Sequence, residues 1–352
     1  MRQTPFVETK NVPEQFTFSR RSFLVMPLAL AACKTGWNVL ELSGLTMGTG
    51  YNVIAVDHSK NVDQAELQAA VDASLSDVIA QMSNWEAGSE LSRFNAHRSN
   101  EAFAVSPELA GVIAAAQQVH DGSNGRFDVT VGPLLDLWGF GAGKTRSDAP
   151  SDAEIAEALA CCGQADSIEV NGNALRKLRP EAEIYVSAIG KGYGIDRVAQ
   201  TLAGFGLTDY MVEVGGDIYT AGLNPEGKAW QIGIETPDAY DRGVMKVVGV
   251  SDMGMATSGD YRNFFEQDGV RYSHILDATT GRPVTHKTAS VTVMTDNAML
   301  ADAWATALLV LGREEGLKIA NDRDMAVLFL ERGDAAGDVV ATASDRFTAL
   351  TA

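Results

Sequence analysis

Apolar residues recur every three or four positions in several long stretches of the chain, which is the spacing of a helix with one buried face. Between residues 63 and 82 they fall at Leu67, Val71, Leu75, Val78, Ile79 and Met82. Ser106 followed by Pro107 is a typical helix start, and Gly312 is a typical helix end. The predicted helices span residues 63–82, 106–120, 152–160, 187–204 and 297–311.

Shorter apolar runs between turn residues predict strands. They span residues 40–55, 210–214, 230–235, 246–251, 289–295 and 325–331. Helices and strands do not alternate regularly, so a doubly wound parallel sheet is disfavoured. We expect an α+β fold with mixed or antiparallel sheets and packed helices.

The size and charge of the chain limit the functions to consider. It has 352 residues, 45% of them hydrophobic, which is enough for one large domain or two closely packed lobes. The formal net charge is -18. Because nucleic-acid binding depends on Lys and Arg meeting phosphates, we expect no nucleic-acid partner.

The first 33 residues resemble an export signal rather than part of the fold. Arg20 and Arg21 precede a short apolar run that ends at Cys33. The run is too short to span a bilayer, and its end resembles the cleavage site of a bacterial lipoprotein. We therefore expect segment 1–33 to be a twin-arginine, lipoprotein-type signal and 34–352 to be a single domain. An ordinary N-terminal segment with a chance cysteine is the alternative.

Polar residues that can do chemistry gather late in the chain. Ala256–Tyr261 and Tyr272–Asp277 place two Ser, two Asp, two Tyr and His274 near glycines. Asp302 and Thr306 are four residues apart in a predicted helix, so they share one face. A carboxylate and a hydroxyl suit Mg²⁺, although Thr306 could instead bond to its own helix and Asp302 could be solvated.

Two glycine-rich stretches suit a phosphorylated ligand with a planar ring. Residues 187–196 open a helix with exposed N–H groups and carry Lys191, which favours phosphate binding. Residues 125–133 combine Arg126, Phe127 and Asp128 with glycines. Such a surface could receive a flat ring, but aromatic residues packed inside a sheet give the same pattern.

Taken in order, these segments resemble the FAD:protein FMN transferase family, the ApbE-type flavin transferases. The matching blocks extend over most of the chain after the signal segment. They are Met47–Thr49, Met82–Ser83, Ser89–Asn95, Phe127–Leu134, Trp138–Phe140, Lys191–Gly192 with Asp196, Gly215–Asp217, Ser258–Tyr261, His274–Asp277 and Ala301–Thr306.

The resemblance implies that FAD is cleaved at its pyrophosphate, that FMN is joined to a Ser or Thr hydroxyl of a target protein, and that AMP is released. It implies Mg²⁺ held by the main-chain carbonyl of Ala188 and the side chains of Asp302 and Thr306. It gives His274 the role of catalytic base. The implied flavin contacts are Met47, Trp85, Arg126, Phe127, Asp128, Tyr185, Lys191 and Ile275.

The resemblance also implies partners and a location. FAD is the donor, and the acceptors are flavoproteins of membrane respiratory complexes or periplasmic reductases. The protein is expected to be exported and lipid-anchored, facing the periplasm. Two other functions remain open: a pyrophosphatase that hydrolyses FAD to FMN and AMP, and a lipid-anchored flavin-binding protein without turnover. The remaining histidines are expected at the surface, namely His58, His97, His120 and His286.

Overall fold

The computed structural model of the protein describes residues 36–352 apart from 142–144, 239–242 and 336. Residues Trp37–Ala352 form one compact unit. The predicted signal segment 1–33, including Cys33, lies outside the described residues. No helix in the described part of the chain is long and apolar enough to cross a membrane.

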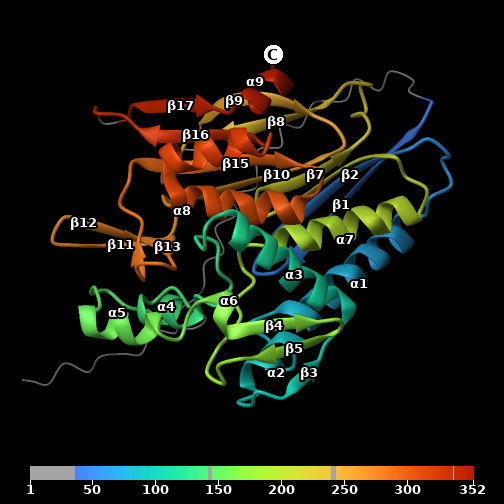
Figure 1. Cartoon of the computed structure of the whole chain (residues 1–352). Helices are drawn as coiled ribbons and strands as arrows, with labels where there is room; N and C mark the ends of the chain where they lie inside the picture. Colours follow the sequence, from blue (N-terminus) through green and yellow to red (C-terminus); the bar gives the residue numbers. More distant parts are fainter. Residues whose placement is uncertain (1–35, 142–144, 239–242, 336) are drawn as a thin grey trace, which may run out of the picture. The chain divides into compact units, whose positions relative to one another are not determined.

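An eight-stranded antiparallel sheet dominates this unit, with strand order β1-β2-β6-β7-β10-β15-β16-β17 (Figure 1). Neighbouring strands in the chain pair directly along much of it, as antiparallel connections allow. The α+β fold expected from the sequence is confirmed. The strands of this sheet are β1 (Asn38–Thr46), β2 (Thr49–Asp57), β6 (Asp209–Val214), β7 (Asp217–Ala221), β10 (Met253–Gly259), β15 (Thr288–Thr295), β16 (Ala326–Arg332) and β17 (Val339–Ala343).

The prediction of one strand over 40–55 is wrong, because this stretch forms the hairpin of β1 and β2. The chain turns at Met47 and Gly48, which have φ angles of 47° and 77°. Gly48 is suited to such a turn, but a methionine with positive φ carries no sequence signal for one.

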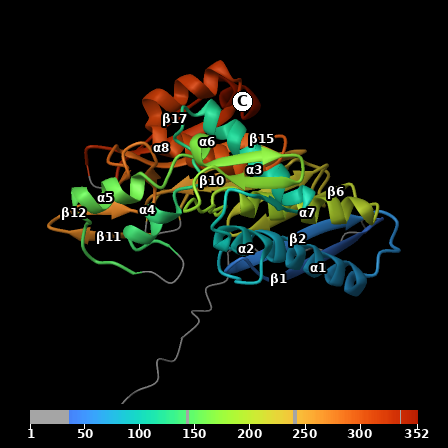
Figure 2. The same ribbon diagram turned by 60° about the horizontal axis from the view of Figure 1, so that its bottom comes forward.

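Helices pack against the sheet and against each other. α8 packs on β10 and β15, and α7 lies between α8 and α1 (Figures 1 and 2). The helices are α1 (Gln64–Met82), α2 (Glu90–Ala96), α3 (Pro107–Gly122), α4 (Gly132–Leu137), α5 (Asp152–Leu159), α6 (Gln164–Ser167), α7 (Gly190–Gly204), α8 (Ala298–Asp322) and α9 (Asp345–Leu350).

Two helices have a boundary that differs from the predicted one by three residues or more. α7 begins at Gly190 rather than at residue 187, because Ile189 before it has non-helical backbone angles, φ -148° and ψ -24°. Gly312 does interrupt α8, with φ 75° and ψ 174°, but the helix resumes beyond it to Asp322.

The contact between α7 and α8 depends on Gly192. A Cβ at this position would lie 2.2 Å from the carbonyl oxygen of Ala298, so only glycine allows the two helices to approach so closely. Asp196, one turn further along α7, accepts hydrogen bonds from Ala298 N at 2.8 Å and Met299 N at 2.9 Å. Together with the Asn297 cap, these bonds satisfy the first N–H groups of α8 and fix its position.

Smaller sheets complete the unit. β11 and β12 lie beside α4 and α5 (Figures 1 and 2). Tyr272 stacks on both Trp138 and Phe265. The strands outside the main sheet are β3 (Ala102–Ala104), β4 (Ile168–Asn171), β5 (Ala174–Lys177), β8 (Trp230–Glu235), β9 (Val244–Val250), β11 (Phe264–Gln267), β12 (Val270–Ser273), β13 (Leu276–Asp277) and β14 (Arg282–Pro283).

Candidate active site

A cavity of about 390 Å³ collects residues from distant parts of the chain. Its walls come from the segment before α4, the turn before α7, the end of β10, the start of β13 and one face of α8. Ten of the twelve residues predicted for the site line it, namely Arg126, Phe127, Asp128, Tyr185, Ala188, Lys191, His274, Ile275, Asp302 and Thr306.

Asp302 is the most buried acidic group of this cavity, with 3% of its surface exposed. Its Oδ1 accepts a hydrogen bond from Lys191 Nζ at 3.2 Å, and its Oδ2 accepts one from Gly192 N at 3.1 Å. Burial raises the pKa of the Asp302 carboxyl, and the Lys191 ammonium opposes this shift. The carboxylate is therefore held in one orientation by two consecutive residues in the first turn of α7.

Thr306 lies one turn after Asp302 on the same face of α8, as its spacing predicts. Its Oγ1 lies 2.9 Å from Ser258 Oγ, so either hydroxyl can be the donor. Ser258 is on β10, against which α8 packs. Asp302, Thr306 and Ala188 thus line one cavity.

Lys191 Nζ also contacts Asp217 Oδ2. Asp217 is 3% exposed, and its Oδ1 accepts a hydrogen bond from Thr257 N at 3.1 Å. Burial alone favours the neutral amine, but the nearby carboxylates of Asp217 and Asp302 together raise the pKa of Lys191 above its usual value. The ammonium of Lys191 therefore forms ion pairs with two buried carboxylates.

His274 reaches the cavity from the loop between β12 and β13. Its Nδ1 lies 3.1 Å from the carbonyl oxygen of Asn263. A carbonyl oxygen can only accept, so Nδ1 carries the proton and Nε2 keeps a lone pair. Burial lowers the pKa of the imidazole below 6.5, which favours this neutral form near pH 7.

The segment 126–128 is held by residues around it. Arg126 forms an ion pair with Asp277, and Phe127 N donates to Ser123 Oγ at 3.0 Å. Asp128 Oδ2 accepts a hydrogen bond from Gln164 N at 2.8 Å. Because this carboxylate is 8% exposed and already bonded to neighbouring backbone, it both lines the cavity and fixes the shape of its wall.

The expectation that the remaining histidines lie at the surface is correct only for His58, which is exposed. His97, His120 and His286 are partly buried. His120 Nδ1 lies 2.8 Å from the carbonyl oxygen of Phe127, so it supports the wall of the cavity. No sequence pattern indicated this contact, because His120 lies in the helix before the glycine-rich stretch.

Tyr185 forms the side of the cavity next to α4. Its ring lies against Gly132, where a Cβ would be 2.3 Å from Cε2. Burial, with a smaller effect of the nearby Asp136, raises the pKa of the phenol to about 12. The phenol therefore stays protonated and can act as a hydrogen-bond donor.

Met47 and Trp85 do not line the cavity. Met47 packs its side chain on α7, and a Cβ at Gly194 would lie 2.7 Å from its terminal methyl group. Trp85 is 64% exposed, although Asn84 beside it donates from Nδ2 to Ile184 O at 2.7 Å, close to Tyr185. Flavin contacts by these two residues stay predictions.

Several lining residues were not assigned a role from the sequence. Ser258 and Tyr261 belong to the polar stretch 256–261, which the sequence did mark as a candidate site. Arg262 lies over the ring of Tyr261 at 5.5 Å and pairs with Glu235. An arginine directly after such a stretch is the signal that could have found it.

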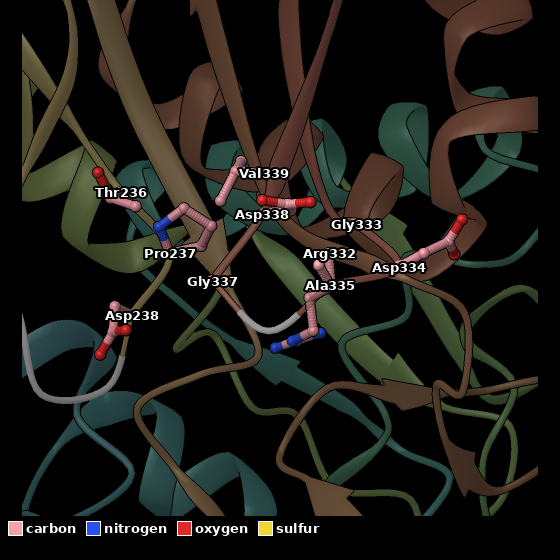
Figure 3. A pocket seen from close by; sticks show the side chains of 10 residues that line it. All are labelled: Thr236, Pro237, Asp238, Arg332, Gly333, Asp334, Ala335, Gly337, Asp338 and Val339. Atoms are coloured by element: carbon pink, nitrogen blue, oxygen red, sulfur yellow. The ribbon is translucent and has the colours of Figure 1, made fainter.

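A second cavity of about 350 Å³ lies between the segments that follow β8 and β16 (Figure 3). Three aspartates and Arg332 border it, and none of the predicted site residues is among the residues that line it. Figure 3 shows the side chains of Asp238 and Asp334 well apart on its rim. It is not a candidate for the chemistry outlined above.

Comparison with known proteins identifies the family and agrees with this fold. The model of the ApbE family matches residues 47–329. A "FAD:protein FMN transferase" of Vibrio cholerae is 44% identical over 307 residues, which cover 87% of this chain and 92% of that protein. A protein of the same name from Haemophilus influenzae is 40% identical over 335 residues, covering 93% and 96%.

Solved structures give the same result. "Flavin Transferase ApbE from Vibrio cholerae" has a TM-score of 0.83 and 41% identity, covering 89% of this chain and 99% of that one. The apo form of the flavinyl transferase ApbE from Pseudomonas stutzeri has a TM-score of 0.82 and 35% identity, covering 91% and 98%. These matches define the chain as an enzyme of the transferase class. It belongs to the ApbE family, which confirms the resemblance noted in the sequence.

Proposed function

We propose that this enzyme transfers the FMN part of FAD to a Ser or Thr hydroxyl of a target protein, in a reaction that requires Mg²⁺ and releases AMP. The relatives named above are called FAD:protein FMN transferases. The observation that carries the proposal is the convergence of His274, Asp302, Thr306 and Ala188 on one cavity.

The residues present suit a magnesium ion. Within the described part of the chain, no group of three or more His, Cys, Asp and Glu forms a metal site. The donors here are one carboxylate, one hydroxyl and one carbonyl. Mg²⁺ is commonly held by one or two carboxylates, with water and substrate phosphate completing its shell. When bound, it would neutralise charge on the pyrophosphate that is cleaved.

His274 then acts on the acceptor. The lone pair on Nε2 takes the proton of the acceptor hydroxyl as its oxygen attacks the phosphorus on the FMN side. A new P–O bond forms, the bond between the two phosphates breaks, and AMP leaves. The hydrogen bond from Nδ1 to Asn263 O orients the ring and stabilises the imidazolium that forms.

Arg126 and Lys191 bring positive charge to the cavity of an otherwise acidic protein. Both are paired with carboxylates, which hold their side chains in place before the dinucleotide binds. Tyr185, Phe127 and Ile275 provide apolar surface for the ring system. We assign these residues to flavin binding.

The variants His274→Gln and Asp302→Ala test the chemistry. Both should bind FAD, and both should lose transfer to the acceptor, the first by about a hundredfold or more because general-base catalysis is removed. His58→Gln, at an exposed histidine that pairs with Asp209, is the control and should be fully active. Undiminished labelling by His274→Gln would remove the base assignment.

Two other functions are possible for a protein with this site. With water in place of the hydroxyl the enzyme would be an FAD pyrophosphatase, and without turnover it would only bind flavin. A metal-ligand set and an oriented base are not needed for storage, so we favour catalysis. Release of FMN and AMP at an undiminished rate without any acceptor would favour the hydrolase.

We also propose that the protein is exported and lipid-anchored through Cys33, facing the periplasm, and that its acceptors are flavoproteins of respiratory complexes or periplasmic reductases. The support is the pattern of residues 1–33 and the family resemblance. Cys33→Ala should appear in the soluble periplasmic fraction. Its recovery in the membrane fraction would contradict the lipid anchor.

A further inference from the structure

The ammonium of Lys191 contacts the carboxylate to which a divalent cation is expected to bind. It contacts Asp217 and lies 3.2 Å from Oδ1 of Asp302, the one carboxylate among the proposed metal ligands. The other oxygen of Asp302 accepts the Gly192 N–H at 3.1 Å. Both oxygens of the carboxylate therefore already have partners within the protein.

The two carboxylates are nearly completely buried, with Asp217 and Asp302 both 3% exposed. Without a cation they would repel each other in a medium where charges are poorly screened. The ammonium of Lys191 therefore stabilises the site, and a divalent cation on Asp302 would do the same. Two cations so close to one carboxylate repel each other.

Asp217 contacts the ammonium of Lys191 but does not line the cavity. It starts β7, its Oδ1 is held by Thr257 N at 3.1 Å, and it is not among the residues that line the cavity. Its Oδ2 is the second partner of the ammonium. Lys191 can thus keep a buried ion pair with Asp217 while its contact with Asp302 is given up.

We propose that Lys191 is an internal competitor for the divalent cation, anchored by Asp217, and that it weakens metal binding at Asp302. The proposal rests on the proposed function, since it takes Asp302 to be a metal ligand. In this view Lys191 keeps the metal-free site paired and stable, and metal binding is coupled to loss of the contact between Lys191 and Asp302.

The test measures metal binding alone, without flavin or acceptor. Mg²⁺ affinity is determined by calorimetry and Mn²⁺ affinity by the magnetic resonance signal of the free ion. Lys191→Met removes the competing ammonium but leaves the buried carboxylate of Asp217 without its ion-pair partner, so this single variant can fold poorly. Lys191→Met combined with Asp217→Asn removes both charges, and the Asn oxygen can still accept the Thr257 N–H.

The double variant should bind Mg²⁺ and Mn²⁺ at least about tenfold more tightly than the wild type. The ammonium that contacts Oδ1 of Asp302 is removed, and the negative charge removed with it, on Asp217, does not line the cavity. Its melting temperature should also rise more on addition of metal. Lys287→Met is the control. It removes a surface lysine, which pairs with Asp334, and should leave metal affinity unchanged.

Each outcome decides the proposal. Equal or weaker metal binding by the double variant, with normal binding by the wild type, would overturn the competition and leave the proposed function intact. Weaker binding would mean that Lys191 supports the site instead. If neither protein binds metal and Asp302→Ala changes nothing, the metal assignment itself fails, and this inference fails with it.

Discussion

Asp196 should make the stability of this enzyme depend on pH in a specific direction. Its two carboxylate oxygens accept hydrogen bonds from Ala298 N and Met299 N, at the start of the helix that carries Asp302 and Thr306. Burial raises the pKa of the Asp196 carboxyl from 3.8 to about 6, and these two hydrogen bonds only partly oppose it.

The direction in which stability changes with pH follows from proton binding to Asp196. Between about pH 4 and pH 6 the folded protein holds a proton on Asp196 that the unfolded chain has released. The folded state therefore gains stability from this group at low pH and loses it as pH rises through about 6. With pKa values of 3.8 and about 6, the loss between about pH 5 and pH 7.5 is about 1.4 kcal/mol.

The measurement is denaturant unfolding of the wild type and Asp196→Asn across that pH range. Asn does not titrate, so the free energy of unfolding of the wild type minus that of the variant should fall by about 1.4 kcal/mol from about pH 5 to pH 7.5. Asp63→Asn, at the cap of α1, corrects for the loss of one negative charge near a helix start. A difference that stays constant, or rises with pH, would refute the reasoning.

Three further variants test how the site is built. Gly192→Ala should destabilise the protein by about 3 kcal/mol or more in thermal unfolding, because its Cβ would meet the Ala298 carbonyl oxygen at 2.2 Å. Gly204→Ala is the control and should be neutral or slightly stabilising, because no atom lies within 4 Å of the added Cβ. Ser258→Ala should raise the Kd for Mg²⁺ about tenfold by freeing the Thr306 hydroxyl, and an unchanged Kd would contradict that role. Trp85→Ala should leave the melting temperature unchanged, since the side chain is 64% exposed. It should weaken FAD binding about tenfold, because an aromatic ring that stacks on the flavin is lost. Equal FAD affinity would show that Trp85 does not contact the flavin.

Local patterns predicted the parts of the fold that are decided locally. α1 follows from its apolar spacing, and the start of α3 follows from Ser106, whose side chain caps the helix as predicted. The β1–β2 hairpin was missed because its turn depends on Met47 at positive φ. Strands as short as β13 and β14 have too few residues to show a period.

In the candidate site, too, local features were predictable from the sequence and contacts between distant residues were not. Asp302 and Thr306 share a face because they are four residues apart on one helix, and sequence alone predicts that. The ion pair between Lys191 and Asp302 joins positions 111 residues apart, and the contact with Asp217 spans 26. Such contacts follow from the packing of α7 on α8 and of β7 beside β10, which no local pattern contains.

The most direct test of the central claim is a count of products. Wild-type enzyme is incubated with FAD, Mg²⁺ and a purified acceptor flavoprotein, and covalent flavin on the denatured acceptor is compared with AMP in solution. We predict one AMP released for each FMN bound to a Ser or Thr side chain, and neither product when the metal is chelated. AMP accompanied only by free FMN, with the acceptor unlabelled, would contradict the proposed transfer.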